Sequence, residues 1–128
     1  MDARLKKIID KIKNKPLREK VTVFLENPSI EIEGKTYTGL SLEQSPAGMS
    51  RHHSYSGGFI EHVVATTEIA LNLCNVIKNV YHGKVDKDLV VAGVILHDIY
   101  KPLTYEEKEG TYVSTPLAER IDHLTLIV

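Results

Sequence analysis

Residues that could hold a metal ion follow the most apolar stretch of the chain. Eight apolar or small residues at 89–96 run directly into His97 and Asp98, and Lys101 comes three residues later. A segment that is apolar on all sides is usually buried, and a buried imidazole and carboxylate are costly unless something pairs with them. The helix dipole also disfavours an anion near a helix C-terminus. A bound metal cation would answer both objections, and the alternative is that His97 and Asp98 simply face water at the helix end.

A third candidate ligand, His62, lies near the start of a helix that we predict over 58–81. Helical spacing places His62 in line with Ile69 and Leu73, and we expect this side of the helix to face the interior. A lone histidine in such a position is more often a hydrogen-bonded core residue than a ligand. The metal interpretation therefore requires the His-Asp pair to come close to His62.

Two adjacent histidines, His52 and His53, lie in a polar loop at 41–57. A loop of this length without helical or strand periodicity is often functional. The alternative is that both are ordinary exposed loop residues, and their spacing alone does not decide between these possibilities.

The elements that must position these residues are mostly helices. Apolar residues at helical spacing predict helices over 2–14, over 16–26, over 58–81, from an Asp86 N-cap to about Tyr100, and from Pro116 onward. Alternation at 29–40 predicts a small β-hairpin, and 104–114 is a loop or a short hairpin. The fold class is therefore all-α, a helical bundle with a small β-hairpin insertion near the N-terminal third.

Two expectations concern how these helices pack. Gly93 lies inside the most apolar helix and costs about 1 kcal/mol relative to alanine, so we expect a close helix crossing there. The last helix would hold His123 and would carry four apolar residues inward, Leu117, Ile121, Leu124 and Ile127.

Length and composition limit the classes of function. The chain has 128 residues, which favours one domain, and its formal net charge of −1 does not suggest a general polyanion binder. The single cysteine, Cys74, cannot form an internal disulfide and fits a reducing compartment. No apolar run could span a bilayer, and the charged start is not a signal peptide. We therefore expect a cytoplasmic protein with no membrane partner.

The order of these motifs resembles the HD-domain metal-dependent phosphohydrolases. The match rests on the histidine loop at 51–56, the Gly-Gly-Phe-Ile-Glu-His turn ending at His62, and Leu-His-Asp-Ile-Tyr-Lys ending at Lys101. The motifs are similar to a branch that includes archaeal phosphodiesterases opening cyclic phosphates and the C-terminal domain of a bacterial 3′-5′ exoribonuclease. The resemblance implies an HD-domain-like helical bundle. We expect one domain over 1–128, with a helical and hairpin extension at 1–50 and a metal-binding core at 51–128.

The resemblance implies a metal site. His62, His97 and Asp98 match three family ligands, and His123 matches a further histidine of members that bind two ions, in which Asp98 would bridge the metals. We expect one or two divalent transition-metal ions, Fe, Mn, Zn or Ni, because imidazole and carboxylate ligands alone do not choose among them.

The resemblance also implies how the substrate is held. Lys101 matches a lysine that neutralises phosphate, and His52 and His53 match loop histidines near the substrate. Asp98 and Lys101 are the implied catalytic residues, because Asp98 would also orient the attacking water.

The sequence departs from the family pattern at two places. Tyr100 stands where many members have glycine, which would narrow or reshape the pocket beside Lys101. The family's last ligand, an aspartate on a later helix, has no counterpart after His123. Either the 128 residues are a shortened version of a longer protein or the site is incomplete. Because the sequence stops in a predicted helix without a cap signal, we expect the first.

The function that we predict is a metal-dependent phosphohydrolase. Its substrate would be a phosphodiester or cyclic phosphate of a nucleotide-like or pterin-like small molecule. One alternative is a nucleotidase or a 3′-5′ exonuclease, and the exonuclease would have a nucleic-acid partner. The others are a non-catalytic metal- or nucleotide-binding domain and a purely structural helical domain. The apolar stripes of the helices could also serve a homo-oligomer.

Overall fold

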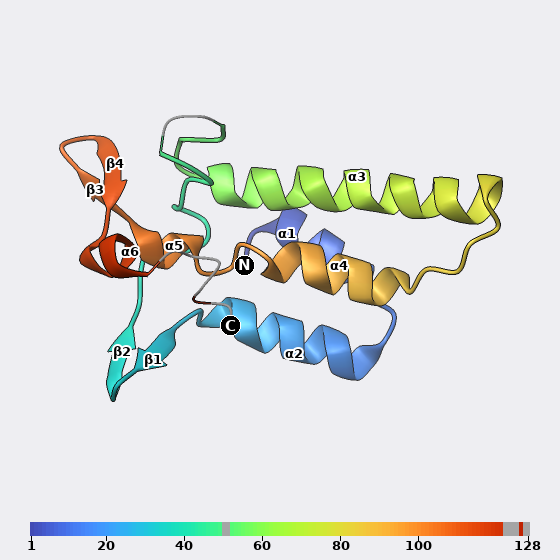
Figure 1. Ribbon diagram of the computed structural model, residues 1–128, viewed down its shortest axis with the longest axis horizontal. Helices are drawn as coiled ribbons and strands as arrows, with labels where there is room; N and C mark the ends of the chain where they lie inside the picture. Colours follow the sequence, from blue (N-terminus) through green and yellow to red (C-terminus); the bar gives the residue numbers. More distant parts are fainter. Residues whose placement is uncertain (50–51, 122–125, 127–128) are drawn as a thin grey trace.

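The computed structural model describes residues 1–49, 52–121 and 126, and its elements are mainly helices (Figure 1). Their bounds are α1 Ala3–Ile9, α2 Lys15–Glu26, β1 Ile30–Ile32, β2 Lys35–Tyr37, α3 Gly58–Val80, α4 Lys87–Leu96, α5 Lys101–Thr104, β3 Tyr105–Lys108, β4 Thr111–Ser114 and α6 Pro116–Arg120. Helices α1 to α4 pack together, while the two hairpins, α5 and α6 lie at one end of this bundle (Figure 1). The predicted helical domain with small antiparallel strands is therefore what the structure contains.

One apolar core joins the first four helices. It is built from fourteen buried side chains: Leu5, Ile8, Ile9, Ile12, Val21, Leu25, Leu42, Phe59, Ile60, Val63, Val91, Ala92, Ile95 and Ile99. A second, smaller cluster of Leu103, Leu117 and Leu126 lies beneath the hairpins. Burial of this kind is the main driving force that holds the helices in place.

Helix α1 is shorter than the predicted 2–14. It ends at Ile9, because the chain turns at Asp10 while Ile12 still reaches the core. The turn that follows is fixed from a distance: the Lys13 and Asn14 amides donate to the two carboxylate oxygens of Asp88, at 2.9 and 2.8 Å. Ile12 is therefore buried as its spacing predicts, but it lies in the turn after α1 and not in the helix.

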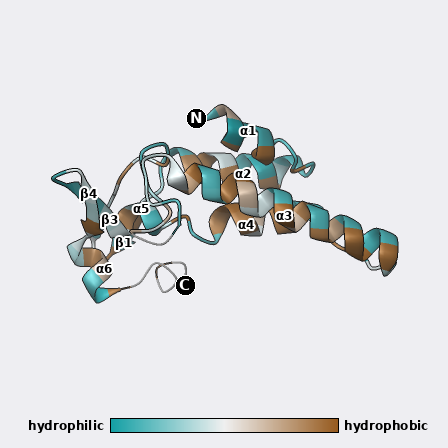
Figure 2. Ribbon diagram, turned by 90° about the horizontal axis from the view of Figure 1, so that it is seen from above, coloured by the Kyte–Doolittle hydropathy of each residue, from teal (hydrophilic) through white to brown (hydrophobic). Residues whose placement is uncertain are grey.

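Helix α3 differs from prediction in what its outer side faces. Its inner side is buried through Ile60, Val63 and Cys74. Ile69 and Leu73, which we expected in the interior, are exposed instead. The C-terminal end of α3 extends beyond the ends of the neighbouring helices (Figure 2), and no described element covers the side of α3 that carries Ile69 and Leu73.

Helix α4 begins as predicted at the Asp86 N-cap, whose carboxylate accepts from the Asp88 and Leu89 amides. It ends at Leu96, and Pro102 lies in the first turn of the separate helix α5. The expected close crossing at Gly93 is wrong: a Cβ built there would meet nothing within 4 Å in the described part of the chain.

Two antiparallel hairpins complete the described chain. Ile30 pairs with Tyr37 in the first, and Tyr105 pairs with Ser114 in the second. The segment after β2 is tied to α5, since the Leu40 amide donates to the Pro102 carbonyl at 3.1 Å. Gly39 permits this approach, because a Cβ there would lie 2.1 Å from the same carbonyl oxygen.

Helix α6 starts at the predicted Thr115 cap and Pro116, but its described part ends at Arg120, where Ile121 turns extended. Leu117 is buried as predicted. His123, Leu124 and Ile127 lie outside the described residues. No helix in the described part of the chain is long and apolar enough to cross a membrane.

Candidate metal centre

The candidate site is built on one buried carboxylate oxygen. Oδ2 of Asp98 lies 3.3 Å from Nε2 of His62, 3.0 Å from Nε2 of His97 and 3.1 Å from Nζ of Lys101. The Asp98 side chain is only 6% exposed. Such a buried charge is tolerated when it is surrounded by charge-compensating or hydrogen-bonding groups. The structure therefore gathers the four residues that the sequence singled out at the ends of two helices.

Each of these residues is held by the local structure of its element. His62 lies in the second turn of α3, and its ring approaches the end of α4 because α3 and α4 pack along each other. His97 is the C-cap of α4, and Asp98 follows in the turn between α4 and α5. Lys101 begins α5, so its side chain returns over this turn to Asp98. An anion at a helix C-terminus is disfavoured by the helix dipole, and the positive charge of Lys101 offsets this cost for Asp98.

The His97 ring is oriented for a cation. Its Nδ1 lies within hydrogen-bond distance of the Val94 carbonyl, which has only an acceptor, so the N–H of a neutral ring belongs on Nδ1. Nε2 then presents its lone pair to Asp98 Oδ2, which is also an acceptor. Metal-binding histidines typically have the same arrangement, with the second ring nitrogen donating to a carbonyl or carboxylate. The donor set therefore fits a divalent transition metal.

His62 is set up as a neutral ligand. Burial lowers the pKa of His62 below its ordinary value, and the positive charge of Lys101 lowers it further, while Asp98 opposes both effects. A neutral imidazole is the form that binds a metal. Since the His97 side chain is 44% exposed, the cluster is open to solvent on that side. A ligand could reach the site from there.

The two loop histidines lie against the same cluster. The ring of His52 stacks on that of His62 with centroids 5.0 Å apart, and the ring of His53 is 5.6 Å from that of His62. Ligand atoms of His52, His53 and His62 all lie within 4.8 Å of one another, as do those of His62, His97 and Asp98. The structure thus places His52 and His53 close enough to contact either a substrate or a metal.

Contacts that the sequence analysis missed hold the histidine loop in place. The Tyr55 hydroxyl donates to a Glu61 carboxylate oxygen, and the Gly58 amide donates to the Tyr55 carbonyl. The loop backbone also presses on the start of α3, because a Cβ at Gly58 would lie 2.0 Å from the His53 carbonyl oxygen. The Gly-Gly sequence was a usable signal, since glycine often marks close backbone approach.

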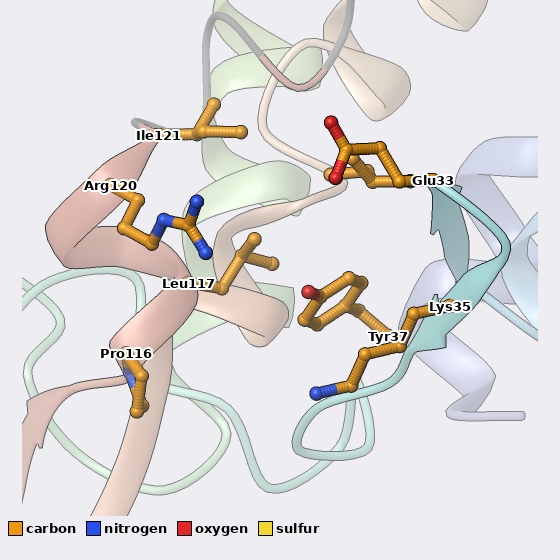
Figure 3. A pocket seen from close by; sticks show the side chains of 8 residues that line it. Glu33, Lys35, Tyr37, Pro116, Leu117, Arg120 and Ile121 are labelled. Carbon is orange, nitrogen blue, oxygen red and sulfur yellow. The ribbon is translucent and has the colours of Figure 1, made fainter.

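A cavity of about 240 Å³ lies away from this cluster, between the first hairpin and α6 (Figure 3). Arg120 of α6 and Lys35 of β2 stand on its two sides, with Tyr37 and Leu117 between them. Its described lining includes none of the candidate ligands. This cavity is therefore separate from the His-Asp cluster.

His123, which was predicted as a metal ligand, lies outside the residues that the structure describes. The six others, His52, His53, His62, His97, Asp98 and Lys101, are brought together. They come from three parts of the chain that share no local periodicity.

Comparison with known proteins is consistent with this arrangement. Residues 59–127 match the family model described as the HD domain. The chain is 44% identical, over 126 residues, to a dihydroneopterin 2′,3′-cyclic phosphate phosphodiesterase of Methanocaldococcus jannaschii. This alignment covers 98% of the chain but 50% of that relative, so the chain spans about half the length of the curated protein it matches. No solved structure gave a significant match.

Proposed function

The chain belongs to the HD-domain family, and on that premise we propose that it is a metal-dependent phosphohydrolase. The substrate that we propose is a phosphodiester or cyclic phosphate of a pterin-like or nucleotide-like small molecule. The observation that carries the proposal is the convergence of His62, His97 and Lys101 on one oxygen of Asp98. The similarity to a cyclic phosphate phosphodiesterase supports this substrate class.

In this proposal His62, His97 and Asp98 hold the ion, with Fe, Mn, Zn and Ni all compatible with their ligand atoms. When bound, a divalent metal lowers the pKa of water from about 15.7 to about 7 and polarises a phosphoryl oxygen. Neutral His62 offers a lone pair at neutral pH because burial lowers its pKa. His123 would complete a second ion site if it approaches this cluster.

The remaining residues bind and orient the phosphate. Lys101 has three donors, and since only one is needed for Asp98, the others can bind phosphate oxygens and offset the charge that develops on them. Asp98 can accept a proton from an attacking water as well as hold the ion. His52 and His53 lie where they could bind the ester group or a further ion.

The first experiment is the metal content of anaerobically purified protein, measured on the wild type and on Asp98→Asn. We expect one or two transition-metal ions per chain in the wild type and a loss of metal in the variant. The loaded protein is then assayed on dihydroneopterin 2′,3′-cyclic phosphate, on a 2′,3′-cyclic nucleotide and on a phosphomonoester. Hydrolysis of a cyclic phosphate ahead of the monoester supports the proposal.

A second candidate is a non-catalytic metal-binding domain. It is favoured by one specific feature: among the residues that the structure describes, Asp98 is the one carboxylate in the two candidate ligand groups, and no second carboxylate joins it there. Metal retained without turnover of any tested ester would favour this function over the phosphohydrolase. A nuclease has less support, since a formal net charge of −1 provides little attraction for a long polyanion. We propose the cytoplasm as the compartment, on the ground of the single free cysteine, Cys74.

A further inference from the structure

The backbone of the histidine loop has a constrained conformation at His53. Its φ angle is 47°, in the left-handed region that non-glycine residues rarely adopt. The other described non-glycine residues with positive φ are Glu33, His82 and Glu109, and each directly precedes a glycine in a hairpin turn or at a helix end. His53 is followed by a serine and lies beside the candidate metal centre. A strained backbone persists only where the surrounding structure fixes it, and such residues cluster at functional sites.

Backbone contacts on two sides fix the His53 carbonyl. It accepts a hydrogen bond from the Ala47 amide at 3.0 Å. It also lies so near the start of α3 that a Cβ at Gly58 would be 2.0 Å from its oxygen. His52 has no backbone hydrogen bond to a described residue and is exposed, whereas His53 is half-buried. The loop therefore fixes His53 more firmly than His52.

One side-chain contact fastens this loop to α3. The Tyr55 hydroxyl donates to a carboxylate oxygen of Glu61, and the Tyr55 carbonyl accepts from the Gly58 amide at 2.9 Å. Within the part of the chain that the structure describes, this is the one hydrogen bond between a side chain of the loop at 41–57 and a side chain of α3. A hydroxyl that donates to a carboxylate makes one of the stronger hydrogen bonds. Because Tyr55 is two residues from His53 and Glu61 directly precedes His62, the contact ties the backbone of one histidine to that of the other.

The ring of His53 is close to the rings of both Tyr55 and His62. Its centroid is 6.1 Å from that of Tyr55 and 5.6 Å from that of His62. Nδ1 of His53 is 3.3 Å from Nδ1 of His52, whose ring stacks on that of His62. Movement of the loop would therefore displace both histidine rings from the candidate metal centre.

We propose that Tyr55 is a positioning residue of the candidate metal centre. Its hydrogen bond to Glu61 keeps His53 in the left-handed conformation with its ring beside His62, where the ring can bind an oxygen of the phosphate ester. This inference rests on the proposed function, and it goes further by choosing His53 over His52 as the loop histidine that contacts the substrate. Because turnover depends strongly on the orientation of the groups that bind the substrate, loss of the Tyr55 hydroxyl should be measurable in kcat/KM.

The first test is hydrogen exchange of the metal-free protein, which needs no turnover. The variant is Tyr55→Phe, which keeps the ring and removes the hydroxyl, and Tyr81→Phe is the matched control because Tyr81 is 75% exposed at the C-terminus of α3. We expect the Ala47 amide, which donates to the His53 carbonyl, to exchange about tenfold faster in Tyr55→Phe. The Gly83 amide, after the far end of α3, should exchange at the wild-type rate in all three proteins. Unchanged protection of the Ala47 amide in Tyr55→Phe overturns the proposal.

The second test is turnover of the metal-loaded protein on the cyclic phosphate that it hydrolyses. We expect Tyr55→Phe to keep the metal content of the wild type and to lose about tenfold in kcat/KM. Glu61→Gln keeps an acceptor for the hydroxyl and should lose less, whereas Glu61→Leu removes the acceptor and should match Tyr55→Phe. The double variant Tyr55→Phe/Glu61→Leu should lose no more than either single variant, because both substitutions remove the same contact. Additive losses, or an unchanged kcat/KM in Tyr55→Phe, overturn the proposal.

A third variant, His53→Asn, separates the loop backbone from the imidazole ring, because asparagine accepts the left-handed conformation. This variant should keep the slow exchange of the Ala47 amide and lose at least as much kcat/KM as Tyr55→Phe. Wild-type turnover in His53→Asn overturns the proposal. If the loaded wild type hydrolyses no ester, the proposed function fails, whereas the exchange rates still decide whether Tyr55 positions the loop.

Discussion

Asp98 lies at the centre of the candidate site, because its Oδ2 atom lies within 3.3 Å of a nitrogen of each of His62, His97 and Lys101. In the proposed site the imidazoles of His62 and His97 would supply lone pairs to an ion, whereas Lys101 would supply positive charge. These contributions are separable, since a metal needs the lone pairs but a phosphate needs the charge. Substitutions at this cluster should therefore separate metal binding from turnover.

Lys101→Met keeps the length of the side chain and removes its charge. We expect the metal content to stay near that of the wild type, while kcat on the hydrolysed phosphodiester falls by roughly 10²- to 10³-fold, the cost of losing one donor to a developing oxyanion. The control is Lys108→Met, because the Lys108 side chain is 69% exposed and pairs only with Glu106 among the described residues. An unchanged kcat would remove Lys101 from the mechanism.

The pKa of His62 provides a prediction about pH. Burial and the Lys101 charge lower the pKa of His62 in the folded protein, while the unfolded chain keeps a value near 6.5. Below about pH 6.5 the unfolded chain takes up a proton that the folded protein still refuses, so the free energy of unfolding falls as the pH falls through this window. Histidine NMR titration of the metal-free protein, assigned with His62→Gln, should give a lowered pKa.

The same titration in Lys101→Met tests the cause of the shift. Removing the charge should move the pKa of His62 upward, toward its ordinary value, while burial keeps part of the shift. A His62 pKa above the ordinary value in the wild type would contradict the burial argument.

At the scale of elements, the sequence predicted which segments are helical better than it predicted what covers them. Helical periodicity, the Asp86 cap and Pro116 placed α2, α3, α4 and the start of α6 to within a few residues. The outer side of α3 could not be predicted, because an apolar spacing reports that a face is apolar and not which partner lies on it. The turn between α1 and α2 is held by Asp88, which is 75 residues away from Lys13 in sequence. Local patterns do not contain such contacts.

At Gly93, inside α4, the close helix crossing expected from the sequence differs from what the structure shows. A Cβ at Gly93 would meet nothing within 4 Å of the described residues, so packing does not require glycine. We expect Gly93→Ala to raise the free energy of unfolding by about 0.5 to 1 kcal/mol through helix propensity and the lost flexibility of the unfolded chain.

Urea unfolding measures this effect, and Gly39→Ala is the opposite control. Its Cβ would lie 2.1 Å from the Pro102 carbonyl oxygen, so that variant should lose stability. A destabilised Gly93→Ala would show that a contact at Gly93 requires the absence of a side chain.

Asp88 links the start of α4 to the turn between α1 and α2. Hydrogen bonds from the Lys13 and Asn14 amides lower the pKa of Asp88 below its ordinary value. The stabilisation is therefore present above the unfolded pKa, near 3.9, and is lost as the pH falls through the lower folded value. We expect Asp88→Asn, which keeps one acceptor, to lower the melting temperature at pH 7.

The difference between Asp88→Asn and the wild type should shrink in strong acid, where the wild-type carboxyl is protonated as well. Thermal melts at several pH values, with the exposed Asp10→Asn as a control, would show this convergence. An equal difference at all pH values would contradict the role of the charge.

At the scale of the whole molecule, the candidate site joins three distant segments: the loop at 52–53, the second turn of α3, and the turn from α4 into α5. The residues could be predicted from motif order because the family resemblance supplied their pairing. Composition and periodicity alone left His62 as an ordinary core histidine. Three features of the site could be found only in the three-dimensional structure. They are the convergence on one Asp98 oxygen, the contact of His97 with the Val94 carbonyl, and the hydrogen bond from Tyr55 to Glu61.

Because the ligands come from separate elements, metal binding should stabilise the whole fold. An ion that binds only the folded protein raises the free energy of unfolding by about 2.7 kcal/mol at a free concentration 100 times its Kd. We expect the melting temperature of the metal-free wild type to rise as the ion is added and to fall back when a chelator removes it.

Asp98→Asn is the matched control for this measurement. It keeps the size of the side chain but removes the charge, so its melting temperature should not respond to the same additions. If both proteins respond equally, the ion binds elsewhere. If the wild type gains stability and the variant does not, the ion links α3 to the α4–α5 turn. The burial of Asp98 is then explained, because its carboxylate holds the ion that connects these two parts of the fold.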